Sequence, residues 1–209
     1  MNKVAHYGVQ RTGTNLLRHC VARSITHLKA PLGTGWKHGH VVDVQGWTVF
    51  VAIRHPLDWL CSFYQYSKIK GEKRTFENFI KQPIKVAEWP SQMTICPIDH
   101  YMVMWYQYYI TNCTNGPYFF KYEDLVLKQR EQRYIMTQLA CVQPGPHIDT
   151  PDVAKKVDPF NEGKVIDKVA WVEDQLYLQK YSALELSAAT QRFKMHRYGF
   201  LLDQFGYKL

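Results

Sequence analysis

Short apolar runs alternate with longer amphipathic stretches along this chain, and the alternation predicts strands that are followed by helices. Strands are predicted at residues 3–9, 36–42, 47–53 and 118–122. The run Trp47-Thr-Val-Phe-Val-Ala-Ile53 is largely apolar and β-branched, which is typical of a strand buried on both faces of a parallel sheet. We therefore expect an α/β fold with a central parallel β-sheet between layers of helices.

Helices are predicted where apolar residues follow the helical period or where a capping signal begins a run. They cover residues 14–28, 56–68, 98–111, 123–139 and 183–204, with a short helix after Thr75 and partial helicity in residues 164–181. Ser182 suits the cap of the last helix. Residues 143–158 and the remainder of residues 70–85 are expected to be loop. The aromatic stripe at residues 101–109 is expected to pack in the core of a single domain, residues 1–209.

The stretch Tyr7-Gly-Val-Gln-Arg-Thr-Gly-Thr-Asn-Leu-Leu17 joins the first strand to the first helix. Its two glycines stand at the spacing of a Walker A loop, G-x-x-x-x-G-K-[ST]. Thr14 replaces the lysine of that pattern, Asn15 replaces the magnesium-binding hydroxyl, and Arg11 supplies a basic residue inside the loop. Backbone N–H groups beside a helix N-terminus can hold a phosphate- or sulfate-like anion without a metal. Taken alone, the stretch fits a plain strand-to-helix turn equally well.

Composition favours an anionic ligand and gives no support to several other classes of protein. The net charge is +8, but the basic residues are scattered and form no long run, which does not suit a nucleic-acid partner. The five cysteines include no C-x-x-C pair, so we expect reduced thiols in a cytoplasmic protein and neither zinc nor disulfides. We expect no signal peptide and no membrane anchor. The oligomeric state cannot be inferred from the sequence.

A second polar group follows the buried strand at residues 47–53. Arg54 stands at the carboxyl end of that strand, where ligands bind in open α/β sheets, and Ser62 lies two turns into the next helix. The two side chains could hold a second phosphate near the first loop. Alternatively, Arg54 pairs with Asp58 at i, i+4 on a solvated helix face.

These motifs, in this order, resemble the sulfotransferases that use 3′-phosphoadenosine 5′-phosphosulfate (PAPS), which have a P-loop-type three-layer fold. The stretch at residues 10–17 is similar to their 5′-phosphosulfate loop. Residues 51–64 are similar to their 3′-phosphate motif, an arginine followed two residues later by proline and eight residues later by serine. Lys121-Tyr-Glu-Asp-Leu125 and Leu201-Leu-Asp-Gln-Phe-Gly-Tyr207 match two later motifs of the family.

The resemblance implies a role for each matching position. Arg54 and Ser62 would bind the 3′-phosphate, and Tyr122 would lie near the adenine. The 5′-phosphosulfate would be bound by Arg11, Thr12, Gly13, Thr14 and Asn15. A late Arg-Lys-Gly tripeptide of many cytosolic animal members is missing here, and Lys155-Lys156 or Lys164 would have to replace it.

The general base of such an enzyme is expected in Lys37-His-Gly-His40, between the two phosphate motifs. His38 and His40 would face the same side of a strand, and either could take the proton of an acceptor. Lys37 would stabilise charge on the transferred group. The alternative is a surface loop with two solvated histidines. Acidic and histidine candidates from the acceptor side are Glu88, Asp99 and His100.

The expected activity is transfer of a sulfuryl group from PAPS to an acceptor hydroxyl or amine, which leaves adenosine 3′,5′-bisphosphate (PAP) and requires no metal. The resemblance implies a small-molecule or carbohydrate-like acceptor, whose pocket would be built from residues 28–36 and 70–99. Two other functions remain open. One is a P-loop small-molecule or nucleoside kinase, and the other is a non-catalytic nucleotide-binding module.

Overall fold

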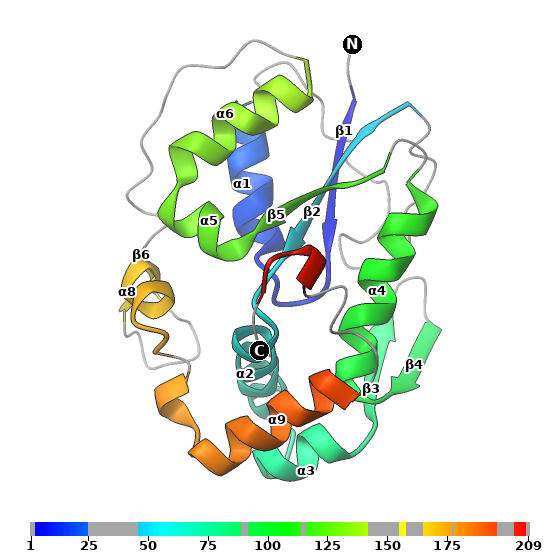
Figure 1. Ribbon diagram of the computed structural model, residues 1–209, viewed down its shortest axis with the longest axis vertical. Helices are drawn as coiled ribbons and strands as arrows, with labels where there is room; N and C mark the ends of the chain where they lie inside the picture. The colour runs from blue at the N-terminus through cyan, green and yellow to red at the C-terminus, as the bar shows by residue number, and fades with distance from the viewer. Residues whose placement is uncertain are drawn as a thin grey trace.

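Three parallel strands form the centre of the fold (Figure 1): β1 (Val4–Gly8), β2 (Thr48–Ile53) and β5 (Tyr118–Lys121), in the order β1-β2-β5. The computed structural model describes residues 3–24, 46–88, 92–113, 116–141, 155–157, 165–176, 178–195 and 203–207. Gly8 pairs with Ala52, and Ile53 pairs with Lys121, so the carboxyl ends of the strands lie at one edge. The residues that follow each strand therefore meet at that edge.

Helices cover both faces of the sheet, which confirms the predicted α/β fold class. Successive β2 side chains enter different cores: Val51 and Ile53 pack in one, Phe50 and Ala52 in the other. The second of these cores is completed by α1 (Thr14–Ser24), α5 (Tyr122–Leu127) and α6 (Gln129–Leu139). The first is completed by α2 (Pro56–Ile69), α3 (Phe76–Lys81), α4 (Ile98–Asn112) and α9 (Ala183–Met195).

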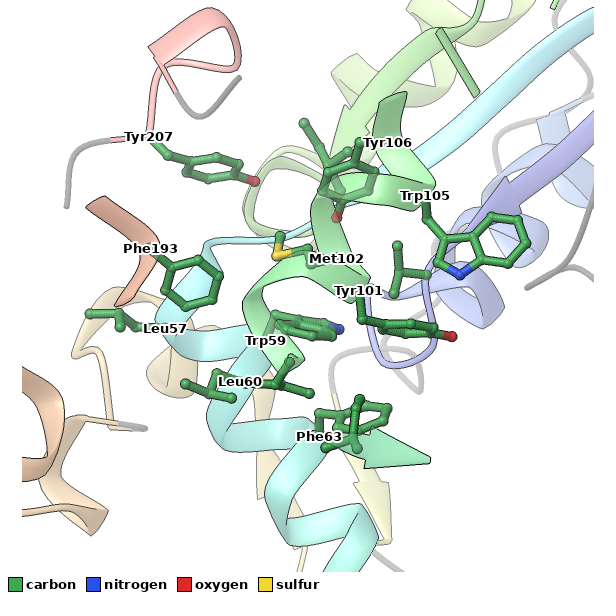
Figure 2. Close-up of a cluster of buried hydrophobic side chains, with 14 of the residues drawn as sticks. Leu57, Trp59, Leu60, Phe63, Tyr101, Met102, Trp105, Tyr106, Phe193 and Tyr207 are labelled. Carbon is green, nitrogen blue, oxygen red and sulfur yellow. The ribbon is translucent and has the colours of Figure 1, made fainter. Parts of the chain in front are cut away.

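Aromatic side chains dominate the core between α2 and α4 (Figure 2). The Trp59 ring stacks on Phe63 and Tyr101, with centroid separations of 5.4 and 6.5 Å. Trp105 and Tyr109 are also buried, so the aromatic stripe of residues 101–109 packs in the core as predicted. This packing holds α2, which begins three residues after β2 ends, against α4.

The chain departs from the predicted elements in three places. The helix predicted over residues 123–139 is two helices, because Lys128, with φ −123° and ψ 40°, ends α5 before α6 begins. An antiparallel hairpin, β3 (Ile84–Glu88) with β4 (Gln92–Cys96), stands where no strand was predicted. A second hairpin pairs β6 (Lys155–Val157), inside the predicted loop, with β7 (Val165–Asp167). β6 and β7 have only three residues each, too few for their side-chain alternation to stand out.

The later elements agree with the predictions for residues 164–182. α9 covers the first part of the helix predicted over residues 183–204, and residues 196–202 lie outside the described residues. α8 (Lys168–Glu173) and a 3₁₀ turn, Leu178–Lys180, give residues 164–181 their partial helicity. Ser182 caps α9 in a capping box, because its Oγ accepts from the Glu185 amide and Glu185 Oε2 accepts from the Ser182 amide. The predicted strand at residues 36–42 and the end of the helix at 25–28 lie outside the described residues. Among the helices that the structure describes, none is both long and apolar enough to span a bilayer.

Candidate functional site

In the loop between β1 and α1, the backbone carbonyl oxygens of residues 9–11 all accept hydrogen bonds from groups within the protein. Thr12 donates to the first through its amide (3.2 Å) and its hydroxyl (2.7 Å). Trp59 Nε1 donates to the second at 2.7 Å, and Figure 2 shows the indole nitrogen directed toward this loop. Arg54 Nη1 donates to the third at 2.9 Å. With the carbonyl oxygens turned inward, the loop is shaped to present N–H groups on its other side.

Positive φ angles within the loop give it the concave form of an anion site. Arg11 has φ +70° and Gly13 has φ +91°. Alternation of such residues with ordinary ones makes a nest of amide groups. α1 begins immediately afterwards, and the first N–H groups of a helix have no acceptor within it and carry its positive dipole end. The loop and the helix together form a site suited to a phosphate or sulfate group.

Arg54 stands behind this loop at the carboxyl end of β2 and is only 6% exposed. Its Nε and Nη2 donate to the two carboxylate oxygens of Asp58 at 2.5 and 2.8 Å. Burial acts to lower the pKa of Arg54, but the charge and hydrogen bonds of Asp58, together with the nearby Tyr122 and Glu123, outweigh burial and hold the pKa above its ordinary value. The i, i+4 pair considered from the sequence thus exists, but it is buried and not solvated. The three hydrogen bonds that Arg54 makes to Asp58 and Arg11 use three of its five N–H groups.

Tyr122 connects the third strand to the same place. Since Ile53 pairs with Lys121, Arg54 and Tyr122 follow their strands at the same level. The guanidinium carbon of Arg54 lies 4.2 Å from the centroid of the Tyr122 ring, a cation–π contact. The same ring covers Gly13 so closely that a Cβ there would lie 2.5 Å from Tyr122 Cδ2. Tyr122 is therefore a buried support between the loop and Arg54.

The side chain of Arg11 leaves the loop and lies along α2. Its Nε donates to Ser62 Oγ at 3.2 Å, and its guanidinium carbon lies 5.4 Å from the centroid of the Tyr66 ring. Arg11 and Ser62 are 51 residues apart in the sequence. The structure thus brings together one residue assigned to the 5′-phosphosulfate and one assigned to the 3′-phosphate.

The other predicted loop residues occupy different environments. Thr12 is fully buried and its hydroxyl serves the loop itself. Thr14 is buried at the start of α1, whereas Asn15 is exposed on the first turn of that helix. Cys61, on α2 beside Ser62, is buried, and burial raises the pKa of its thiol, which suits packing and not a nucleophile.

Supporting contacts at two carboxylates, first Asp58 and second Glu123, were not anticipated from the sequence. Trp171 Nε1 on α8 donates to Asp58 Oδ1 at 3.1 Å, so the carboxylate that holds Arg54 is itself held. The His55 amide donates to Glu123 Oε1, and Tyr207 Oη donates to Glu123 Oε2, both at 2.8 Å. The motifs at residues 121–125 and 201–207 carry a signal for the second contact, but no local pattern links Trp171 to Asp58.

The residues expected to supply the general base are only partly described. Lys37, His38 and His40 lie outside the described residues, as does Lys164. The backbone of Lys155-Lys156 belongs to β6. Of the acceptor-side candidates, Glu88 ends β3, His100 is exposed, and Asp99 is buried, with Arg192 Nη2 on α9 at 3.4 Å from its Oδ1.

Within the described ranges, no three His, Cys, Asp or Glu side chains gather in a way that could hold a metal ion. The groups at the strand ends are instead amides, guanidinium groups and hydroxyls. Each of these can bind an oxyanion directly.

Comparison with known proteins identifies the fold. No family model matches the sequence, and no curated protein matches it. Among solved structures, the chain is similar to mouse sulfotransferase SULT7A1 complexed with PAP, with a TM-score of 0.54 and 12% sequence identity. The match covers 97% of this chain and 88% of that protein. The three-layer α/β arrangement described above is therefore the fold of a sulfotransferase.

Proposed function

We propose that this protein is a PAPS-dependent sulfotransferase, formed as one domain over residues 1–209. The observation that carries the proposal is the convergence of Arg11, Ser62, Arg54 and Tyr122 at the carboxyl edge of the sheet. Four groups from three separate motifs are linked there by hydrogen bonds and a ring contact. The fold shared with a sulfotransferase complexed with PAP adds support. Five free cysteines suit the reducing environment of the cytoplasm.

In this proposal the loop amides, Thr14, Asn15 and Arg11 bind the 5′-phosphosulfate. The 3′-phosphate lies at Ser62, where the hydroxyl now bonded to Arg11 can turn to the phosphate. Arg54 acts in two ways: it holds the carbonyl of the loop through Nη1, and its charge attracts the anion. Tyr122 acts mainly as a support for Gly13 and Arg54 near the adenine.

The reaction is an in-line transfer. An acceptor hydroxyl or amine attacks sulfur, so a new bond to sulfur forms while the bond from sulfur to the bridging phosphate oxygen breaks. His38 or His40 takes the acceptor proton, with Lys37 beside the transferred group, and PAP leaves with its electron pair. Arg11 and the loop amides stabilise the charge that grows on the bridging oxygen. The group moved carries one negative charge less than a terminal phosphoryl group, so we propose that no metal is required.

Calorimetric titration of PAP in the presence of EDTA tests the proposal. We expect binding in the micromolar range or tighter, which magnesium does not improve. ATP with magnesium serves as the competing ligand. Magnesium-dependent ATP binding, with no response to PAP, would replace the proposal with a P-loop kinase. Binding of PAP without sulfuryl transfer from PAPS to any class of acceptor would favour a binding module.

Ser62 allows the 3′-phosphate to be tested separately. Ser62→Ala should weaken PAP binding about tenfold, the scale of a lost hydrogen bond to a charged group. It should leave binding of adenosine 5′-phosphate, which has no 3′-phosphate, unchanged. Ser67→Ala is the matched control, because Ser67 is on the same helix and donates to the Phe63 carbonyl oxygen. Equal losses for the two nucleotides would remove Ser62 from the 3′ site.

The general base is tested by His38→Ala and His40→Ala. Both variants should bind PAP as the wild type does. At least one should lose most of its turnover with PAPS, because it can no longer take the acceptor proton. Full turnover in both variants would mean that another residue is the general base.

A further inference from the structure

A cavity of about 490 Å³ opens beside the anion loop, on the side where the Arg11 side chain lies along α2. Gln10, inside the loop, forms its inner end. One face of α2 forms a wall, since Phe63, Tyr66, Ser67 and Lys70 follow at helical spacing. A volume of this size holds a small organic molecule.

The floor of the cavity is apolar. Phe63, Phe79 and Ile84 line it, and each is at most 5% exposed. The rings of Phe63 and Phe79 lie 6.2 Å apart, centroid to centroid. The Tyr66 ring, which is only partly buried, stands as a side wall above this floor. Aromatic side chains in such a position favour contact with a flat or ring-shaped apolar body.

The outer end of the cavity is charged. Glu72 and Arg74 both line it, but they bind each other through two side-chain contacts of 2.5 and 2.9 Å and largely cancel. Lys70 then gives this end a positive charge. Its Nζ lies 5.7 Å from the centroid of the Tyr66 ring, while the Arg11 guanidinium carbon lies 5.4 Å from the same centroid. One aromatic wall is therefore flanked by two cations.

We propose that this cavity binds the acceptor and that the acceptor is a hydroxyaryl carboxylate, a small ring compound with a hydroxyl at one end and a carboxylate at the other. The inference rests on the proposed sulfotransferase function. The ring lies on the floor beside Tyr66, with the hydroxyl toward Gln10 and the anion loop. The carboxylate lies at Lys70, the C-cap of α2, four residues or about 6 Å along the helix axis beyond Tyr66. Residues 70–84 of this cavity fall in a stretch that the sequence assigned to the acceptor.

The test uses two probes that differ only in charge: 3-(4-hydroxyphenyl)propionate and the corresponding neutral amide, 3-(4-hydroxyphenyl)propanamide. Each is titrated into the full chain with and without saturating PAP, and binding is followed by calorimetry or ligand-observed NMR. We expect the carboxylate to bind about tenfold more tightly than the amide. Equal affinities, or no binding of either probe at millimolar concentration, would overturn the proposal.

Lys70→Gln should lower the affinity for the carboxylate probe to the affinity for the amide probe. Lys68→Gln is the control, because it removes the same charge from an exposed position of α2 that does not line the cavity. If both variants lower the affinity for the carboxylate probe equally, the effect comes from the overall positive charge of the protein, and Lys70 is not the carboxylate site. The probes bind in this assay without sulfuryl transfer, so failure of PAP binding and failure of the cavity assignment give separate results.

Discussion

The hydroxyl of Tyr207 donates to the carboxylate of Glu123, 84 residues earlier, at 2.8 Å. The other oxygen of that carboxylate accepts the His55 amide, next to Arg54 in the chain. The Tyr207 ring also meets the His55 ring edge to face, with centroids 5.5 Å apart. Segments from three parts of the sequence thus set the position at which β2 turns into α2.

Tyr207→Phe should lower the free energy of unfolding by about 1.5–3 kcal/mol, because it removes one partly buried hydrogen bond to a charged acceptor. Urea denaturation measures the loss. Tyr134→Phe, at a tyrosine that is 59% exposed on α6, should change stability by less than about 0.5 kcal/mol. A loss no larger than that control would mean that the hydrogen bond adds nothing to the fold.

Gly13→Ala should cost more stability than Gly71→Ala, although both glycines have φ near +90°. A Cβ at Gly71 meets nothing within 4 Å, so this variant carries only the backbone penalty of about 1–2 kcal/mol. A Cβ at Gly13 also meets the Tyr122 ring, which should add about 1–3 kcal/mol and abolish PAP binding. Addition of Tyr122→Leu should restore part of the stability. Equal costs at the two glycines would argue against close packing of Tyr122 on the loop.

Arg11→Gly should be more stable than Arg11→Ala by about 1 kcal/mol, because glycine adopts φ +70° without the steric cost that alanine has there. Both variants lose the same side-chain contacts, so both should bind PAP at least tenfold more weakly than the wild type. At Arg18, exposed within α1, the order should reverse, since alanine favours a helix over glycine by about 1 kcal/mol. Thermal or urea unfolding of the four variants measures these differences in stability. If the glycine and alanine variants rank in the same order at both positions, the loop is not strained at Arg11.

The Arg54–Asp58 pair should show strong coupling in a double-mutant cycle. Asp58→Asn or Arg54→Met alone should cost about 3–5 kcal/mol, since each leaves a buried charge without its partner. The double variant should cost clearly less than the sum. Glu77 and Lys81 form an i, i+4 pair on α3 with both side chains about half exposed, and their coupling should stay below about 0.5 kcal/mol. Additive losses at Arg54 and Asp58 would show that the two side chains act independently.

The stability of the protein should depend on pH through Glu72 and Arg74 at the outer end of the cavity. The hydrogen bond from Arg74 holds the pKa of Glu72 at about 2, against an ordinary value of 4.5. A lowered pKa in the folded state means that the stabilisation is complete above pH 4.5 and is lost as the pH falls toward 2. The free energy of unfolding of the wild type should exceed that of Glu72→Gln by up to about 1 kcal/mol at pH 6. The difference should shrink below pH 4.5 and vanish in an Arg74→Gln background. A difference independent of pH would contradict this assignment.

Much of the site could be predicted because parallel strands end at one edge of a sheet. That rule places the loop after β1, Arg54 after β2 and Tyr122 after β5 near one another, whatever the details of packing. The burial of the Arg54–Asp58 pair could not be predicted in the same way. Their spacing of four residues suits a solvated helix surface equally well, and only the packing of neighbouring elements decides which occurs.

Sequence patterns missed β6, β7 and the break at Lys128 for two different physical reasons. β6 and β7 have three residues each, too few for an alternating pattern to differ from chance. The break at Lys128 carries no proline or glycine signal, because it follows from the way α5 and α6 separately pack against α1. The break therefore depends on contacts between segments that are distant in the sequence, which a local pattern does not report.

The contact between Trp171 and Asp58 has a consequence for the order in which the protein matures. The two residues are 113 positions apart, and contacts of such separation form late because a long loop must close first. During translation the loop, Arg54 and Ser62 leave the ribosome well before Trp171 is synthesised. The surroundings of Arg54 are therefore completed by one of the later segments to be made, and a nascent chain holding only the first motifs lacks the complete candidate site.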